Sequence, residues 1–264
     1  MRTVALWMVL LTVLLGATVG ARAGSLGDAV EVRIISDNGS ELPIYPVSQG
    51  PQIRKAYAEA TRGDQYSIVV RNRLNRRVGI VVAVDGRNII SGRKSWLRND
   101  ERMYILDSYA EGKFKGWRTG DDRINRFYFT TAADSYAAAF NDESAMGVIA
   151  VAVYPEVRRY EPQVNRYRGG SKSRMPAPSA QKKAMASDPG SESAGTGYGR
   201  EEYSPVRVVA FEPQHAAMER VFVKYEWRET LCRKGIIAKS SHVPRPGNRM
   251  WDDDGYAAPP PGGN

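Results

Sequence analysis

Short runs of β-branched and aromatic residues, each bounded by glycine, asparagine, aspartate or proline, constrain the fold of this chain more than any other feature. Between residues 30 and 156 these runs are YSIVVRN (66–72), VGIVVAV (78–84), RMYILDSY (102–109), RFYFT (126–130) and MGVIAVAVYP (146–155). Runs of this composition, with boundaries of this kind, are typical of β-strands. Two of them contain GIVVAV and GVIAVAV, which are apolar on both faces and therefore predicted to lie at the centre of a layered structure.

Two further runs follow near the C-terminal end of the sequence. One is VRVVAF (206–211), and the other is RVFVKYEWRE (220–229), which places Val221, Val223, Tyr225 and Trp227 on one face. The opposite face of the second run is mainly charged, a pattern typical of a half-buried antiparallel strand. Because two strands alone are rarely stable in water, we expect them to complete the sheet that begins before residue 157.

Helical patterns are scarce. The best candidate is TAADSYAAAFNDES (131–144), which Asp134 could cap, while residues 51–63 favour either a short helix or an irregular crossover. The chain is therefore predicted to be all-β: an antiparallel sandwich, jelly-roll or Greek-key like, with one short helix.

Composition divides the chain into five segments. Residues 1–23 have the features of a secretory signal peptide, because Arg2 precedes an uncharged stretch and Ala21 and Ala23 form an A-x-A cleavage site. A retained transmembrane anchor is the alternative, since the apolar stretch is just long enough to span a bilayer. Residues 24–156 form the first part of the sandwich, and 204–242 hold its final strands. The linker 157–203 and the Pro- and Gly-rich tail 243–264 are predicted to be disordered.

Charge and cysteine content limit the kinds of partner and site. The chain has 38 Lys and Arg residues, two of them in the predicted signal peptide, and 29 Asp and Glu residues, so the mature chain carries a net charge of +7. This excess favours anionic partners. Cys232 is the single cysteine, so an internal disulfide is excluded and the thiol is either free or paired between chains. Only two histidines accompany it, which argues against a structural zinc site, and no cofactor is predicted.

Asp85 and Gly86 follow the apolar run that ends at Val84. An Asp-Gly pair between two strand-like runs is a strong hairpin signal, because a type I′ turn requires positive φ at both positions. Asp85 is therefore predicted to be a turn residue. A functional carboxylate at this position is the alternative.

Patterns that suggest catalysis are weak. Ser91 to Lys94 fits S-x-x-K, but the companion motifs of serine acyl-enzymes are missing. Asp134, Asp142 and Glu143 could supply the two carboxyl groups that glycoside hydrolysis needs, although sequence spacing does not give their separation. A helix cap and surface charge explain the same three residues without chemistry.

The segment from residue 62 to residue 102 is strongly basic, with ten basic residues, nine of them arginine, against four acidic ones. The planar guanidinium group of arginine suits carboxylate and phosphate, and arginine together with exposed tryptophan suits anionic glycans or single-stranded nucleic acid. The predicted binding residues are Arg73, Arg76, Arg77, Arg87, Arg93, Lys94, Trp96, Trp117 and Arg118. The alternative is a solvated arginine-rich face with both tryptophans packed in the core.

Five stretches together resemble a group of exported bacterial proteins of unassigned function: GIVVAVDGRNIISG, GWR at 116–118, RFYFT, MGVIAVAVYPE and the late YEWRE. The resemblance covers residues 60–156 and 198–235. It implies a location in the Gram-negative envelope, periplasmic or secreted, and it transfers no catalytic residue.

These observations predict an exported, non-enzymatic binding or assembly module with a basic, arginine-rich face. The expected partner is anionic and belongs to the cell envelope, either a glycan or a protein, while nucleic acid is disfavoured. No membrane span is expected after signal cleavage, and the sequence does not indicate an oligomeric state. A hydrolase that acts on envelope polysaccharide is the alternative function.

Overall fold

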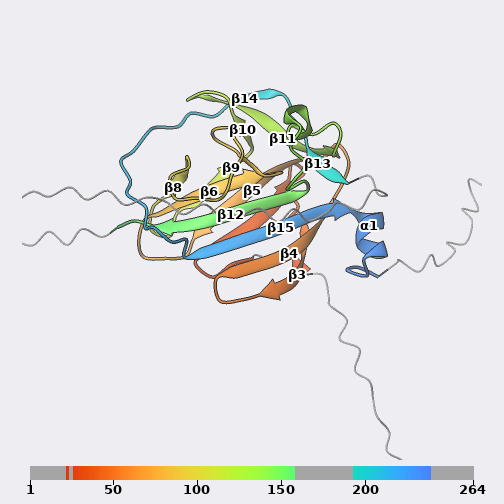
Figure 1. The fold of residues 1–264 in the computed structure, drawn as a ribbon, viewed down its shortest axis with the longest axis horizontal. Coiled ribbons are helices and arrows are strands. Elements are labelled where there is room, and N and C mark those ends of the chain that lie inside the picture. The colour runs from red at the N-terminus through yellow and green to blue at the C-terminus, as the bar shows by residue number, and fades with distance from the viewer. Residues whose placement is uncertain (1–21, 24–25, 158–192, 239–264) are drawn as a thin grey trace, which may run out of the picture.

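Two β-sheets pack face to face in the computed structural model, which describes residues 22–23, 26–157 and 193–238 (Figure 1). In strand order, the first sheet is β1 (Arg22–Ala23), β3 (Pro43–Gln49), β4 (Ile53–Ala60), β15 (Glu219–Trp227), β12 (Val148–Pro155), β6 (Val78–Val84) and β7 (Arg87–Asn88), with β8 (Tyr104–Leu106) also paired to β6. The second is β10 (Gly116–Arg118), β11 (Arg123–Thr131), β5 (Gln65–Asn72) and β2 (Val30–Ser36), with β13 (Ala194–Thr196) and β14 (Glu201–Tyr203) on β11 and β9 (Glu111–Phe114) on β5. The predicted all-β sandwich is confirmed.

Strand β15 lies in the middle of the first sheet, between β4 and β12 (Figure 1). It pairs antiparallel with β12, where Val221 faces Val151, and parallel with β4, where Val221 faces Arg54. Every other pairing among the described strands is antiparallel. A strand from the C-terminal part of the chain therefore completes a sheet whose other strands all precede residue 157.

The apolar residues of the central strands form one core between the sheets. Alternate residues of β2 and β15 are buried there, as period-two strands require. Strand β6 is buried on both faces: Ile80 and Val82 enter the core, while Val81 packs on the outer side with Ala152 and Tyr154 of β12. The prediction that the runs GIVVAV and GVIAVAV, which lie in β6 and β12, are central in a layered structure is confirmed.

The outer face of β6 and β12 is covered by loops. Leu97 and Met103, both from the loop between β7 and β8, pack against the small cluster around Val81. A Cβ atom placed on Gly79 would lie 2.3 Å from the sulfur of Met103 and 2.7 Å from the ring of Phe211, so any larger residue here would push these two side chains away from the sheet. The loop that covers the sheet is therefore held close against it.

The predicted helix at 131–144 is wrong. The structure has turns there and one 3₁₀ turn, Ala138–Phe140, which ends at Asn141 in the left-handed region. The ring of Tyr136 lies 4.5 Å from that of Trp117, so tertiary ring packing outweighs the helical propensity of the alanines. The α-helix among the described residues is instead α1 (Arg228–Arg233), which begins directly after β15.

Four other expectations also need correction. Residues 51–63 contain β4, in which Ala56, Ala58 and Ala60 are buried with period two. Residues 206–211 form no strand, and residues 102–109 contribute only the short β8. Residues 193–203, predicted to belong to a disordered linker, contain β13 and β14. Their glycines are needed for close packing, since a Cβ at Gly197 would lie 2.1 Å from the ring of Tyr128.

The predicted signal peptide, most of the linker and the tail lie outside the described residues, except that Arg22 and Ala23 pair with β3. Within the part of the chain that is described, no helix is long and apolar enough to cross a membrane.

Candidate functional site

The Asp85-Gly86 turn joins β6 to β7, and the loop between β7 and β8 follows directly. Both residues have positive φ, 49° and 77°, so the predicted hairpin turn is confirmed. The buried amide of Asn88 then shapes the loop: its Oδ1 accepts the backbone N–H groups of Ile90 and Ser91, and its Nδ2 donates to the carbonyl of Arg102. One side chain thus joins the two ends of the loop.

Glu101 fixes the centre of the same loop. Its carboxylate accepts hydrogen bonds from the Ser95 hydroxyl at 2.7 Å and from the backbone N–H groups of Trp96 and Arg98 at 2.8 and 2.9 Å. Asn88 Nδ2 lies 3.3 Å from the same carboxylate. Because these donors occupy both carboxylate oxygens, Glu101 holds the loop in shape and is not free to act on a ligand.

This loop encloses an open cavity of about 610 Å³, here called the Trp96 cavity. Its lining residues are Ile90, Ser91, Arg93, Lys94, Trp96, Arg98, Asp100, Glu101 and Arg102. Four of them are cationic and two are acidic, which leaves a net charge of +2. The indole of Trp96 is 62% exposed, so a large apolar ring stands in water beside these charges.

The four cations of the Trp96 cavity differ in how far they are neutralised. Lys94 Nζ lies 3.0 Å from an Asp142 carboxylate oxygen and 5.6 Å from the centroid of the Trp96 ring. Arg98 pairs with Asp100 at 2.8 Å, but both side chains are well exposed, and such pairs are weak. Arg93 and Arg102 are exposed and make no side-chain hydrogen bond or ion pair with any described residue.

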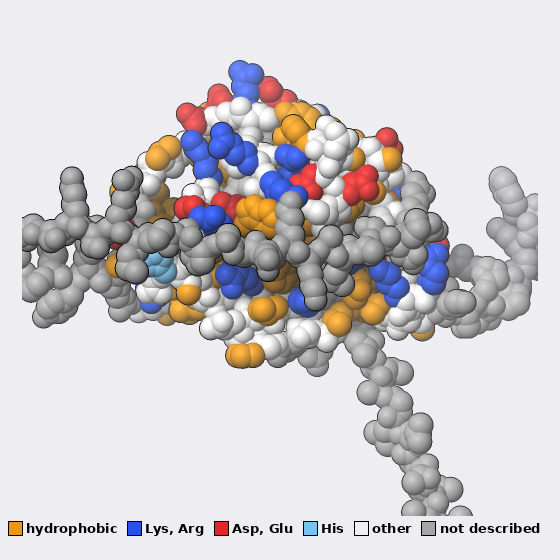
Figure 2. All heavy atoms as spheres, in the orientation of Figure 1, with side chains coloured by type: hydrophobic (Ala, Val, Ile, Leu, Met, Phe, Trp, Pro, Cys, Tyr) orange, Lys and Arg blue, Asp and Glu red, His pale blue; other side chains and the backbone are white. Residues whose placement is uncertain are grey.

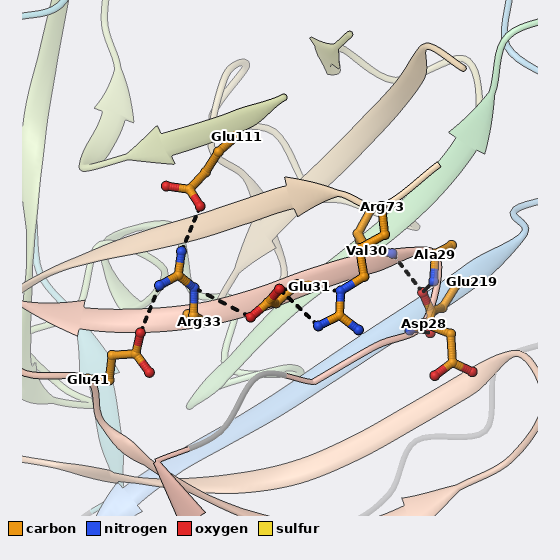
Figure 3. Close-up of polar contacts among 9 residues, drawn as sticks. All are labelled: Asp28, Ala29, Val30, Glu31, Arg33, Glu41, Arg73, Glu111 and Glu219. Carbon is orange, nitrogen blue, oxygen red and sulfur yellow. Dashed lines mark hydrogen bonds and ion pairs between the residues drawn. The ribbon is translucent and has the colours of Figure 1, made fainter. Parts of the chain in front are cut away.

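The three predicted binding arginines of the 73–77 loop each contact another part of the protein. Arg73 pairs with Glu31 at 2.9 Å, at one end of an ion-pair network on the second sheet that continues through Arg33 (Figure 3). Arg76 donates to the carbonyl of Glu156, and Arg77 pairs with the carboxylates of Glu156 and Asp107. On the face drawn in Figure 2, basic side chains are interspersed with acidic and apolar ones and do not form one continuous patch.

Three more predicted residues are turned inward or engaged. Arg87 is buried, donates to the carbonyl of Gly92, and lies 3.9 Å from the Phe140 ring centroid. The Trp117 indole is only 2% exposed, and its Nε1 donates to the carbonyl of Gly197. Arg118 donates to the Tyr104 hydroxyl and the Ser204 carbonyl.

Of the nine predicted binding residues, the structure brings three together in the Trp96 cavity: Arg93, Lys94 and Trp96. Sequence reasoning missed Arg98 and Arg102, which line the same cavity. Their signal was the dense charge of RNDER at 98–102, but a strand was expected from residue 102 onward.

The Asp85 carboxylate is fully buried beneath the turn. It accepts the backbone N–H groups of Gly147 at 2.8 Å and Thr196 at 2.7 Å and the Tyr225 hydroxyl at 2.5 Å. Burial raises the pKa of Asp85 to about 6, although these hydrogen bonds favour the charged form and limit the rise. It lines neither of the two described cavities, so its role is to tie the turn to segments far away in the sequence.

A second buried carboxylate, Glu219 at the start of β15, binds the chain just before β2. It accepts the backbone N–H groups of Asp28, Ala29 and Val30 at 2.8, 2.9 and 3.2 Å (Figure 3). Arg54 lies 3.7 Å away and offsets part of the buried charge. This residue joins segments about 190 positions apart, and like Asp85 it lines neither cavity.

The candidate hydrolytic carboxylates do not form a pair. Asp134 and Glu143 are exposed and line neither described cavity. Burial alone would raise the pKa of Asp142, but hydrogen bonds from Ser144 and Lys94 outweigh burial and lower it. Asp142 therefore acts as the counterion of Lys94.

Among residues 26–157 and 193–238, no group of three or more His, Cys, Asp or Glu side chains is placed to hold a metal ion. Comparison with known proteins finds no matching family model, no matching curated protein and no matching solved structure.

Proposed function

We propose that this chain is an exported, non-enzymatic binding module and that its Trp96 cavity takes an anionic partner of the cell envelope, specifically an acidic polysaccharide. The observation that carries the proposal is that one cavity holds the exposed ring of Trp96 together with Arg93 and Arg102, two arginines that have no counterion among the described residues. Export is proposed from the N-terminal sequence alone, and the envelope location from the resemblance.

The chemistry of these three side chains suits an acidic sugar. Each guanidinium group can bind a carboxylate, phosphate or sulfate group through two parallel hydrogen bonds, and such charge-assisted bonds are the stronger kind. The flat apolar face of an indole packs against the C–H face of a sugar ring. A neutral sugar would use only the ring, and a simple anion would use only the arginines.

A preformed loop supports binding at this position. The side chains of Asn88 and Glu101 fix the backbone of residues 90, 91, 96 and 98, so little conformational entropy is lost when a ligand binds. Lys94 adds positive charge at the rim, although Asp142 neutralises part of it. The hydrolase alternative gains no support from the geometry of Asp134 and Glu143 described above.

The test is binding of the chain to polygalacturonate, with dextran as the neutral polysaccharide and polyglutamate as a polyanion without sugar rings. We expect binding to polygalacturonate, weaker binding to polyglutamate and none to dextran. The double variant Arg93→Ala/Arg102→Ala should lose roughly tenfold or more in affinity, because each lost charge-assisted hydrogen bond is worth about 1.5–3 kcal/mol.

The matched control is Arg71→Ala/Arg200→Ala, which removes the same charge from exposed arginines that line neither cavity. This control should bind like the wild type. Equal losses in both double variants would mean that only net charge matters and would contradict the proposed site. Release of reducing ends from polygalacturonate by the wild-type chain would favour the hydrolase instead.

A further inference from the structure

The segment between β14 and β15 has the composition of a strand but no strand partner. Here residues 205–213 are called the strap. Its ends are fixed by backbone hydrogen bonds from Val206 N–H to the Asp121 carbonyl and from Gln214 N–H to the Pro155 carbonyl. Between these points the N–H groups of residues 207–211 make no hydrogen bond with any described residue. In Figure 1 this segment arches away from the sheets at the left of the view.

The strap exposes β-branched side chains to water. Val208 is 88% exposed, and Val206 and Val209 are each 40% exposed. An extended chain with free backbone groups and exposed valines is a template for pairing with another extended chain, and sheet proteins usually cover or interrupt such edges. Here nothing among the described residues covers it.

A cavity of about 790 Å³, here called the strap groove, lies beneath this segment. On the opposite side its lining includes Met103, Tyr104 and Ile105, which belong to β8 or precede it, and Phe211 closes it at the strap side. Because β8 is the short outermost strand next to β6, the groove runs between a sheet edge and the strap.

The charges left unneutralised in the groove are mainly positive. Arg102 and Arg207 line it, and their side chains make no hydrogen bond or ion pair with any described residue. The other two lining arginines, 77 and 118, are bound to the protein itself. Among the lining carboxylates, Asp107 pairs with Arg77 and Glu101 holds its loop, which leaves Asp121.

We propose that the strap groove binds an extended segment of another protein by strand addition, and that this segment alternates apolar residues with acidic ones. The unpaired N–H groups of residues 207–211 would pair with the backbone carbonyls of the incoming segment, while the carbonyls of Ala210 and Glu212 already accept hydrogen bonds from Arg77 and Val157. The apolar side chains of the incoming segment would pack on Val208, Met103 or Phe211, and its carboxylates would face Arg102 and Arg207. This inference does not rest on the proposed function, although the linings of the two cavities share Ile90, Glu101 and Arg102, and Arg102 would contact the ligand in both.

The probe is a capped nine-residue peptide of alternating valine and glutamate, titrated against the full chain to about 1 mM. Two control peptides go with it: one with lysine in place of glutamate, and one that is N-methylated at every residue, which lacks all backbone donors on both edges. We expect only the first peptide to bind. Amide hydrogen exchange should slow at residues 207–211 on binding, since these N–H groups are open to water in the free chain.

Variants of the strap provide the second part of the test. Val208→Pro and Val209→Pro remove adjacent N–H groups that the free chain does not use, so neither should lower the melting temperature. Because donors alternate between the two edges of an extended chain, at least one of the two proline variants should bind the peptide tenfold or more weakly. The matched controls Val208→Ala and Val209→Ala keep the N–H groups and should change affinity by less than this.

Four outcomes overturn the proposal: no binding of the valine–glutamate peptide, equal binding of the N-methylated peptide, unchanged exchange at residues 207–211, or wild-type affinity in both proline variants. A fifth is self-association of the free chain, with slowed exchange at the strap, which would make a second copy the occupant. If the wild-type chain binds polygalacturonate but not the valine–glutamate peptide, the strap-groove proposal fails while the proposed function stands.

Discussion

Protonation of Asp85 should stabilise the fold, which is the reverse of the usual behaviour of an aspartate. The folded-state pKa, about 6, lies above the ordinary value of 3.8. The stability that this group contributes is therefore fully present below pH 3.8 and is lost as the pH rises through 6. A shift of this size corresponds to ~3 kcal/mol over the whole range, of which ~1 kcal/mol falls between pH 5 and pH 7.

The variant Asp85→Asn isolates this contribution. Asparagine tolerates the positive φ of the turn, so the backbone should be preserved, but the side chain no longer titrates. Its amide would leave one of the N–H groups of Gly147 and Thr196 without an acceptor, which lowers stability by ~1–3 kcal/mol independently of pH. The informative quantity is therefore the change with pH of the difference between wild type and variant.

Urea unfolding followed by tryptophan fluorescence gives that difference at intervals from pH 5 to pH 7. The wild type should lose stability relative to Asp85→Asn as the pH rises, by ~1 kcal/mol over this range. When Tyr225→Phe is added to both chains, the loss with pH should be steeper, because the closest hydrogen-bond donor to the Asp85 carboxylate is gone. A difference that is flat, or that grows in favour of the wild type as the pH rises, would refute the raised pKa.

Two further substitutions test the packing. Glu219→Gln should lower the free energy of unfolding by ~2 kcal/mol, because an amide cannot accept all the backbone N–H groups that the carboxylate does. The control Glu229→Gln, at an exposed position, should change it by less than ~0.5 kcal/mol, and similar losses in both variants would contradict the buried role of Glu219. Gly116→Ala should lower the free energy of unfolding by ~2 kcal/mol or more, since the added Cβ would lie 2.1 Å from the carbonyl oxygen of Asn125. In the control Gly120→Ala the added Cβ meets nothing closer than 3.7 Å, so equal thermal unfolding midpoints for the two variants would refute the close approach of Gly116 to Asn125.

The strands that sequence reasoning found are those whose signal is local. Runs such as 78–84 and 146–155 combine β-branched composition with clear boundaries, and both became central strands. Strand β4 was missed because its buried positions are alanines, which also favour helices, and only pairing with β3 and β15 shows that their period is two. The helix expected at 131–144 failed because Tyr136 packs on Trp117, a contact that no local pattern reveals.

The candidate site was predictable only in part for the same reason. Arg93, Lys94 and Trp96 lie close in sequence, so their grouping follows from chain connectivity. Whether an arginine is free depends on its counterion, which is often distant: Arg77 pairs with Glu156, 79 positions away. The opening of the strap groove also depends on tertiary structure, because residues 206–211 have a strand-like sequence and lack only a partner.

The salt dependence of polygalacturonate binding tests the central claim most directly. Affinity measured from low to high salt should fall steeply for the wild type and for Arg71→Ala/Arg200→Ala, with equal slopes of log K against log salt. For Arg93→Ala/Arg102→Ala the slope should be shallower by about 1 to 2, because two cations no longer displace counterions from the ligand. If that slope equals the wild-type slope, the Trp96 cavity is not where the anionic partner binds.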